Sequence, residues 1–255
     1  MITIKSKEEI ESMRRGGKVL AAILGELTAL IKPGLKTLEL DHRARALLKS
    51  HGAASSFLGY KPDFGVDGEA YPSSVCVSVN HEIVHGLPGE RVLYEGDIIS
   101  LDFGVYSEEL HTDSARTIPV GKVDAKTKRL IEVTRTALDK GIAAVKPGAT
   151  TGDIGHAIQS YVEGAGMNVI RELVGHGVGR ELHEDPSLPN WGVPGEGVVL
   201  KEGMTIALEP MVSLGSPIIS LASDKWTYET KDGSLSAHFE DTMLVTKTGA
   251  EILTR

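Results

Sequence analysis

Cysteine is almost absent from the sequence, and long apolar runs are absent altogether. Cys76 is the only cysteine among 255 residues, so no disulfide can form within the chain, which fits a reducing compartment. No stretch of 18 apolar residues occurs, and the charged N-terminal segment has no apolar core of signal-peptide length. These absences exclude a disulfide-built miniprotein and a membrane span, and they predict a soluble cytoplasmic protein.

An excess of basic charge is also lacking. The chain carries 27 Lys and Arg against 35 Asp and Glu, a formal net charge of −8, which argues against nucleic acid as the main partner. With 41% hydrophobic and 24% charged residues, the composition is that of a globular protein and excludes a disordered or collagen-like one. This length suits one or two domains. Because no low-complexity linker divides the chain, we predict a single domain over residues 1–255.

Two pairs of similar segments indicate an internal duplication. Residues 31–37 resemble residues 145–151 at an offset of 114 positions, and residues 95–102 resemble residues 202–209 at an offset of 107. In the second pair, a Glu-Gly turn leads into an apolar run that ends in a carboxylate. A Lys-Pro-Gly helix stop is common and explains the first pair, but it does not explain the second. The chain is therefore predicted to repeat one α-then-β unit.

The predicted secondary structure follows the same duplication. Capping and stop signals delimit four helices, at residues 6–33, 37–52, 125–145 and 151–164. Strand-like apolar runs lie at residues 75–79, 97–105, 204–208 and 239–246. The two halves would cover about residues 1–120 and 121–255. Helices grouped apart from strands predict an α+β fold in which the helices cover one face of an antiparallel sheet.

Four carboxylates occupy related places at the ends of these strands. Asp102 closes one strand, and the segment after it suits a hairpin that returns Asp113 beside it. Glu209 holds the place of Asp102 in the second half, and Glu240 stands at the head of the last strand. Each acid alone is best interpreted as a surface residue. Converging together, they would repel and take up protons unless cations neutralised them, and four carboxylates balance two divalent ions. The pattern favours a two-metal site.

Three histidines are candidates for the same site. His176 lies in a glycine-rich turn, where it is either structural or a metal ligand. His183 follows seven residues later, so both side chains reach one site only if the glycines bend the chain. His85 holds the corresponding place in the first half.

One motif points to a different chemistry. Residues 81–85 read His-Glu-Ile-Val-His, the zinc-protease signature, which requires a helix to bring both histidines to one face. A strand-like run ends just before this segment and Gly-Leu-Pro-Gly follows it, leaving too few residues for a stable helix. We therefore interpret the match as coincidental.

Six motifs resemble, in order, those of type I methionine aminopeptidases. They are residues 80–88, 100–104, 111–113, 175–186, 207–211 and 238–246, which together span most of the chain. The resemblance implies the pita-bread fold, a pseudo-twofold α+β domain, in agreement with the duplication. It also implies two divalent ions, of cobalt, manganese, iron, nickel or zinc. The ligands that it implies are Asp102, Asp113, His176, Glu209 and Glu240.

The resemblance assigns further roles within the site. Glu209 would relay a proton to the leaving nitrogen, His183 would stabilise the oxyanion, and His85 would bind the substrate amide. His85 and His183 would thus be catalytic and substrate-binding residues. The methionine pocket would be lined by Tyr71, Cys76 and Trp226.

Three features depart from the family pattern and concern the shape of the pocket. Phe57 stands where a cysteine is common, and Leu182 stands where an aromatic residue is common. The loop over residues 61–70 is longer than usual. For Cys76, a thiol packed in the core is the alternative to a pocket residue.

The activity implied is metal-dependent removal of the initiator methionine from nascent proteins whose second residue is small, with a metal-activated hydroxide attacking the scissile carbonyl. Nascent polypeptide N-termini would be the partners. Ribosome association is compatible with this activity, a monomer is expected, and neither a membrane nor nucleic acid is required. A proline-specific peptidase of the same fold is one alternative, although such enzymes usually carry an additional N-terminal domain. A catalytically inactive binding module is another, although none of the five ligands is lost.

Overall fold

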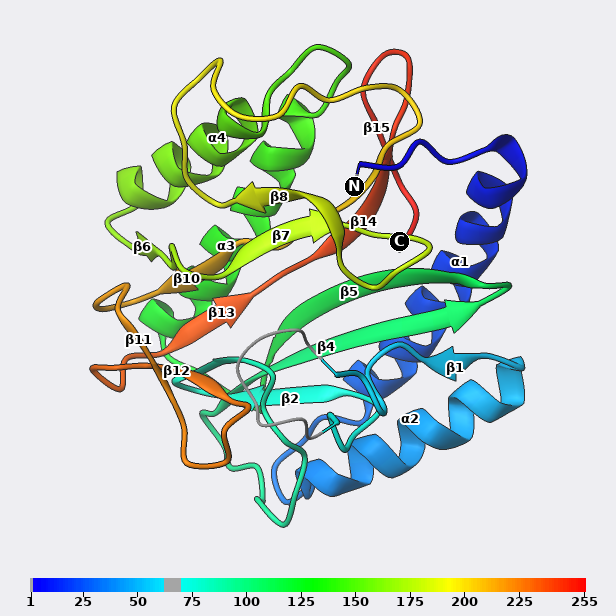
Figure 1. Ribbon diagram of the computed structural model, residues 1–255. Helices are drawn as coiled ribbons and strands as arrows, with labels where there is room; N and C mark the ends of the chain where they lie inside the picture. The colour runs from blue at the N-terminus through cyan, green and yellow to red at the C-terminus, as the bar shows by residue number, and fades with distance from the viewer. Residues whose placement is uncertain (1, 62–69) are drawn as a thin grey trace.

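The computed structural model describes residues 2–61 and 70–255 (Figure 1). Its helices in these ranges are α1 Lys7–Ala29, α2 Thr37–His51, α3 Ala125–Ala144 and α4 Thr151–Gly164. Figure 1 shows α1 and α2, in blue, beside one group of strands, and α3 and α4, in green, beside another. All four predicted helices are confirmed, although α1 ends short of the predicted stop at Pro33. None of these helices combines the length and the apolar character that a bilayer span requires.

Local signals set the ends of the helices. At the start of α1, the Ser6 hydroxyl accepts a hydrogen bond from the Glu9 backbone N–H, and the Glu9 carboxylate accepts one from the Ser6 N–H. Thr150 and Asp153 form the same capping box at the start of α4. These bonds satisfy N–H groups that have no partner within the helix. Gly52 ends α2 with φ of 65°, the left-handed conformation that glycine adopts without steric cost.

Within residues 2–61 and 70–255, the strands pair antiparallel and divide among four sheets. They are β1 Ala54–Ser55, β2 Cys76–Val79, β3 Glu82–Val84, β4 Ile98–Ser107, β5 Leu110–Pro119, β6 Asn168–Val169, β7 Val174–Gly177, β8 Glu184–Pro189, β9 Thr205–Leu208, β10 Met211–Ser213, β11 Ile219–Leu221, β12 Tyr228–Thr230, β13 Ser236–His238, β14 Asp241–Val245 and β15 Ala250–Ile252. One sheet has the order β1-β4-β2, with β5 also paired to β4, and another has the order β15-β14-β9-β7-β8. Two three-stranded sheets have the orders β13-β10-β6 and β11-β12-β3.

The alternation of side chains along β4 separates a core face from a site face. Leu101 and Phe103 point into an apolar core that they share with Leu20 of α1 and Leu40 of α2. Asp102, between them in sequence, projects to the opposite face, as the period of a strand requires. A second apolar core joins α3 and α4 to β9, β10 and β14. Each half of the chain therefore packs its own pair of helices and leaves a polar strand face free.

Backbone hydrogen bonds repeat between the halves at the offsets seen in the sequence. At the start of α2, the Thr37 N–H donates to the Arg91 carbonyl over 2.9 Å. At the start of α4, the Thr151 N–H donates to the Val198 carbonyl over 3.0 Å. The helix residues are 114 positions apart and the carbonyls 107, so the predicted duplicated α-β units share a detailed backbone arrangement.

Two local predictions have separate outcomes. The zinc-protease-like segment contains the strand β3, not a helix, so its two histidines are not on one helical face and the coincidental reading is confirmed. His176 lies within the strand β7 and not in a turn, because the glycine on each side of it, Gly175 and Gly177, still pairs with a neighbouring strand. Most of the loop over residues 61–70 lies outside the described residues.

Candidate metal centre and substrate cavity

One cavity of about 980 Å³ is lined by every residue that the sequence analysis assigned to the site. These residues are Tyr71, Cys76, His85, Asp102, Asp113, His176, His183, Glu209, Trp226 and Glu240. Phe57 and Leu182, which depart from the family pattern, also line it. The cavity therefore joins residues from both halves of the chain, as the resemblance implied.

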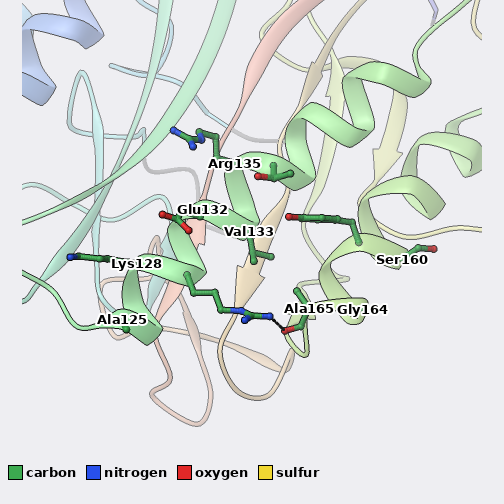
Figure 2. Close-up of a pocket in the computed structure, with 11 residues that line it drawn as sticks. Ala125, Lys128, Glu132, Val133, Arg135, Ser160, Gly164 and Ala165 are labelled. Carbon is green, nitrogen blue, oxygen red and sulfur yellow. Dashed lines mark hydrogen bonds between the residues drawn. The ribbon is translucent and has the colours of Figure 1, made fainter.

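A second hollow lies between α3 and α4 and has a volume of about 800 Å³ (Figure 2). Its polar groups are dispersed: Figure 2 shows Lys128 and Glu132 of α3 extending away from Ser160 of α4. The Arg129 guanidinium donates across it to the Ala165 carbonyl over 3.3 Å. Because it gathers no cluster of chemically active side chains, the first cavity is the candidate site.

Strand pairing brings the carboxylates together. In the β4–β5 hairpin, Asp102 pairs with Ala115 and Gly104 pairs with Asp113, so the two aspartates lie diagonally on the same face. Ala115 also exchanges two backbone hydrogen bonds with Glu240, over 3.3 and 2.9 Å. These bonds tie the head of β14 to the hairpin. The prediction that a hairpin returns Asp113 beside Asp102 is confirmed.

Position 104 in β4 has no room for a side chain, so it requires glycine. A Cβ atom added at Gly104 would lie 2.7 Å from the Ser56 Cβ and 2.8 Å from a ring carbon of Phe57. Such approaches are too close for non-bonded carbon atoms, so the hairpin and the cavity wall pack together only with glycine at this position.

His176 presents a lone pair to the carboxylates. Its Nδ1–H donates to the Gly177 carbonyl over 2.8 Å, because a carbonyl oxygen only accepts. The proton of the neutral ring is thereby assigned to Nδ1, and Nε2 is an acceptor that faces Oε1 of Glu209 at 3.5 Å. Two acceptors held face to face need a cation between them or beside them. This arrangement is that of a metal-ligating histidine with its other nitrogen held by a carbonyl.

Burial makes the carboxylate cluster unfavourable in its charged form. Burial raises the pKa of Asp102 to about 7 and the pKa of Glu209 to about 7. Burial first, and the neighbouring carboxylates second, raise the pKa values of Asp113 and Glu240 well above the ordinary range. Oδ1 of Asp102 and Oε1 of Glu240 are buried without any hydrogen-bond partner among the described residues. Divalent cations would satisfy these oxygens and keep all four groups ionised, so the residues present fit a metal centre.

The donor atoms form two groups that share Glu240. Asp113, His176 and Glu240 offer atoms within 4.8 Å of one another, and so do Glu209, His238 and Glu240. Asp102 belongs to neither group, although it lines the same cavity beside Asp113. Four of the five predicted ligands therefore converge tightly, and the structure adds His238, to which the sequence analysis assigned no role.

His183 reaches the cavity because the chain turns after β7. Its ring centroid lies 4.4 Å from that of His176, so the glycines do bend the chain as the spacing required. Burial, and then the neighbouring histidines, lower its pKa to about 2, so the ring is neutral. The Tyr60 hydroxyl lies 2.6 Å from its Nδ1. Tyr60 is a second residue that the sequence analysis missed, because it lies in an irregular loop where no periodicity marks it.

His85 lines the same cavity, with its ring centroid 5.9 Å from that of Tyr228. Its φ is 60°, in the left-handed region that non-glycine residues rarely adopt. Backbone strain of this kind is characteristic of functional sites. Burial lowers the pKa of His85 to about 4, so it is neutral near pH 7.

An apolar cluster forms the remaining wall. It consists of Phe57, Tyr71, Cys76, Leu182 and Trp226. The rings of Tyr71 and Trp226 meet edge to face with centroids 5.1 Å apart, and the Tyr71 hydroxyl donates to the Gly86 carbonyl over 2.9 Å. The two departures from the family pattern, Phe57 and Leu182, are therefore neighbours of the three predicted pocket residues. Their bulk and shape bear directly on the apolar end of the cavity.

Comparison with known proteins identifies the family. Residues 11–247 match the model of metallopeptidase family M24. The chain belongs to this family. It is 48% identical to methionine aminopeptidase 1 of Bacillus subtilis over the full length of both chains. It is 44% identical to a methionine aminopeptidase of Clostridium acetobutylicum over 100% of this chain and 99% of that one.

Solved structures of the same family have the same fold as this chain. A methionine aminopeptidase from Thermotoga maritima matches with a TM-score of 0.95 and 48% identity, covering 100% of both chains. Prolidase from Pyrococcus furiosus matches with a TM-score of 0.77 and 26% identity, covering 99% of this chain and 65% of that one. The predicted resemblance and the pita-bread fold are thus confirmed. As a member of a metallopeptidase family, the chain is a hydrolase that uses divalent metal.

Proposed function

We propose that this chain is an aminopeptidase that removes the N-terminal methionine from new polypeptides when the second residue is small. The observation that carries the proposal is one cavity in which a buried carboxylate–histidine cluster adjoins an apolar pocket. The full-length similarity to methionine aminopeptidases supports it, whereas the prolidases match with much lower identity.

The metal ligands would be Asp102, Asp113, His176, Glu209 and Glu240. Four carboxylates neutralise two divalent ions, and oxygen-rich donors suit manganese, iron or cobalt better than a thiolate-type zinc site. Divalent ions bound there would lower the pKa of a water molecule toward neutrality and polarise the scissile carbonyl.

Glu209 would carry the proton of the reaction. Its carboxylate lines the cavity beside the other candidate ligands. It would accept the proton of the attacking water and deliver it to the amide nitrogen that leaves as an amine.

His183 would hold a proton at Nε2 and donate it to the carbonyl oxygen as negative charge develops there. A phenol is a stronger donor than a neutral imidazole N–H, so the Tyr60 hydroxyl donates to Nδ1 across the 2.6 Å contact. Nε2 of the neutral ring then keeps the N–H. His85, which lines the same cavity, would hydrogen-bond the substrate amide.

The apolar cluster would receive the methionine side chain. Tyr71, Cys76 and Trp226 offer aromatic and sulfur surface, which suits a flexible thioether. The closure of this wall by Phe57 and Leu182 would set the depth of the pocket.

The test is hydrolysis of a Met-Ala-Ser peptide by protein stripped with EDTA and then supplied with each divalent ion in turn. We expect activity only after metal is restored, rates for Met-Ala and Met-Gly that exceed those for Met-Phe by orders of magnitude, and no cleavage of Xaa-Pro dipeptides. Glu209→Gln should be inactive, and Glu132→Gln, an exposed change on α3, should match wild type. Equal rates on Met-Ala and Met-Phe, or preferential cleavage of Xaa-Pro, would contradict the proposal.

A further inference from the structure

Lys5 is a buried cation beside the substrate cavity, and the site described above gives it no role. It lies in the segment that precedes α1, and the exposed fraction of its side chain is 0%. Its ammonium donates to Oε2 of Glu184 over 2.7 Å and also to the Thr3 hydroxyl, which in turn donates to the same oxygen. Lysine is rarely buried completely unless a partner offsets its loss of hydration. The contact therefore differs from an exposed ion pair, which contributes little.

Glu184 closes the loop that carries His183. This loop, residues 178–183, connects β7 to β8 and is named the His183 loop here. Oε1 of Glu184 accepts from the Arg180 N–H over 2.6 Å and from the Glu181 N–H over 3.2 Å. One oxygen of this carboxylate thus holds the backbone of the loop, and the other is held by Lys5. Because Glu184 follows His183 directly, any shift of its carboxylate would reach the neighbouring ring.

Lys5 meets the start of the His183 loop as well as its end. A Cβ atom added at Gly179 would lie 2.2 Å from Cε of Lys5 and 2.8 Å from Nζ, so a side chain at position 179 would occupy the place of the Lys5 side chain. The Lys5 N–H donates to the Gly203 carbonyl over 2.9 Å, which fixes the backbone from which that side chain extends. The chain thus places one buried ammonium against both ends of the loop.

The His183 loop forms part of the cavity wall. Residues 180–185 line the cavity, and Thr3 lines it with them. The bonds from Lys5 and Thr3 outweigh the effect of burial and lower the pKa of Glu184, so its carboxylate is ionised at neutral pH. Without Lys5, this charge would be buried without a cation, and its escape toward water would release the two backbone N–H groups that it holds.

We propose that Lys5 is a positioning residue for His183, which acts through the Glu184 carboxylate to hold the His183 loop in the shape that presents the ring to the substrate. The inference rests on the proposed function, in which His183 donates to the developing oxyanion. It makes the segment before α1 part of the apparatus that shapes the site. The ring is then held from two directions, by Tyr60 at Nδ1 and through its own backbone by Glu184.

Lys5→Met tests the inference in the metal-loaded protein, because methionine keeps the length of the side chain and removes its charge. With Met-Ala-Ser as substrate, we expect kcat to fall at least about tenfold and KM to change little, since small misplacements of a group that acts in the transition state are costly. Lys5→Met combined with His183→Ala should be no slower than His183→Ala alone. General damage to the structure would slow both backgrounds equally. The matched control is Lys7→Met, an exposed change two residues later, which should keep wild-type kcat.

Proton–nitrogen NMR of the His183 ring gives a second readout, which does not depend on activity. The ring signals are assigned by their loss in His183→Ala. We expect Lys5→Met to move them and to leave those of His156, an exposed residue of α4, in place. If Lys5→Met fails to fold, Thr3→Val removes one bond to Glu184 and keeps the ion pair, and it should move the same signals and lower kcat about threefold.

Ring signals of His183 that stay in place would overturn the inference, whatever the rate. Wild-type kcat in Lys5→Met, or an equal fall in the His183→Ala background, would also overturn it. If the metal-loaded wild type cleaves no Met-Ala-Ser while Lys5→Met still moves the His183 signals, the proposed function fails and the positioning of the ring by Lys5 stands.

Discussion

At the scale of single residues, the cavity is defined by groups that burial makes unfavourable without a partner. The carboxyl groups of Asp102 and Glu240 carry buried oxygens that bond to no described residue, and the pKa values of both are raised. Removing one such group should therefore harm metal binding far more than folding, because the isolated charge contributes nothing favourable to the metal-free protein.

Asp102→Asn tests this distinction. Because the amide keeps the shape but loses the negative charge, we expect kcat/KM on Met-Ala-Ser to fall at least about a hundredfold and bound metal to decrease. The melting temperature of the metal-free protein should not fall. Asp139→Asn, an exposed change on α3, is the control. Full activity with unchanged metal stoichiometry would falsify the role given to Asp102.

A double-mutant cycle tests the contact between Tyr60 and His183. His183→Ala should lower kcat about a hundredfold with little change in KM, because its N–H acts mainly in the transition state. Tyr60→Phe should lower kcat about tenfold by releasing the ring of His183. The double variant should be no slower than His183→Ala, since Tyr60 acts through that ring.

The control for this cycle is Tyr94→Phe, at a residue that is 68% exposed. If the fall in kcat of the double variant equals the product of the falls in the two single variants, Tyr60 acts independently of His183. A loss confined to KM would make His183 a binder of the ground-state substrate.

At the scale of elements, the helices owe their ends to short-range bonds and the strands owe their places to distant ones. The Asp153 carboxylate accepts a hydrogen bond from the Thr150 N–H over 2.7 Å and another from the Gly195 N–H over 2.9 Å. It therefore joins α4 to the loop that follows β8. These backbone N–H groups hold the pKa of Asp153 below its ordinary value of 3.8. The ionised form is the one that stabilises the helix start.

Asp153→Ala should therefore lower the melting temperature in a pH-dependent way. A carboxyl whose pKa is depressed by folding stabilises the protein fully above its unfolded pKa and loses that effect as pH falls through the folded pKa. We expect the difference from wild type to be present at pH 7 and to vanish in acid below 3.8. Thermal melts of both proteins across this range measure it, with Glu132→Ala as a control. A difference that persists unchanged in acid would show that the ionised cap is not responsible.

At the scale of the whole molecule, the halves are joined through the site itself. Glu240 at the head of β14 exchanges backbone bonds with Ala115 of β5, and the Thr242 hydroxyl donates to the Asp113 carbonyl over 2.9 Å. The Lys5 N–H donates to the Gly203 carbonyl over 2.9 Å and ties the N-terminal segment to the second half. We accordingly propose that residues 1–255 form a single domain.

Calorimetry of the intact chain tests this proposal. We expect one unfolding transition, which divalent metal shifts to higher temperature, because ions that bind only the folded state stabilise it by about 2.7 kcal/mol at a hundred times the dissociation constant. Asp102→Asn should show a smaller shift. Two transitions, of which metal moves only one, would mean that the halves unfold separately.

The sequence by itself determined the helices, the duplication and the candidate carboxylates and histidines that line the cavity. The capping box of Ser6 and Glu9 and the left-handed end at Gly52 depend on neighbours a few positions away, so they could be read from the order of residues. The carboxylates Asp102 and Glu209 could be paired because an apolar run leads to each at the same offset.

Only the tertiary structure decided the division of the strands among four sheets and the roles open to Tyr60 and His238. Tyr60 meets His183 from a position 123 residues earlier in the chain, and no local pattern encodes that contact. His238 lies two positions before Glu240 and has no sequence signal of its own. Its ring is buried with Nε2 3.4 Å from Oε2 of Glu209, in a position that the pairing of β13 with β10 sets. Contacts between distant segments depend on packing, and packing depends on the whole chain at once.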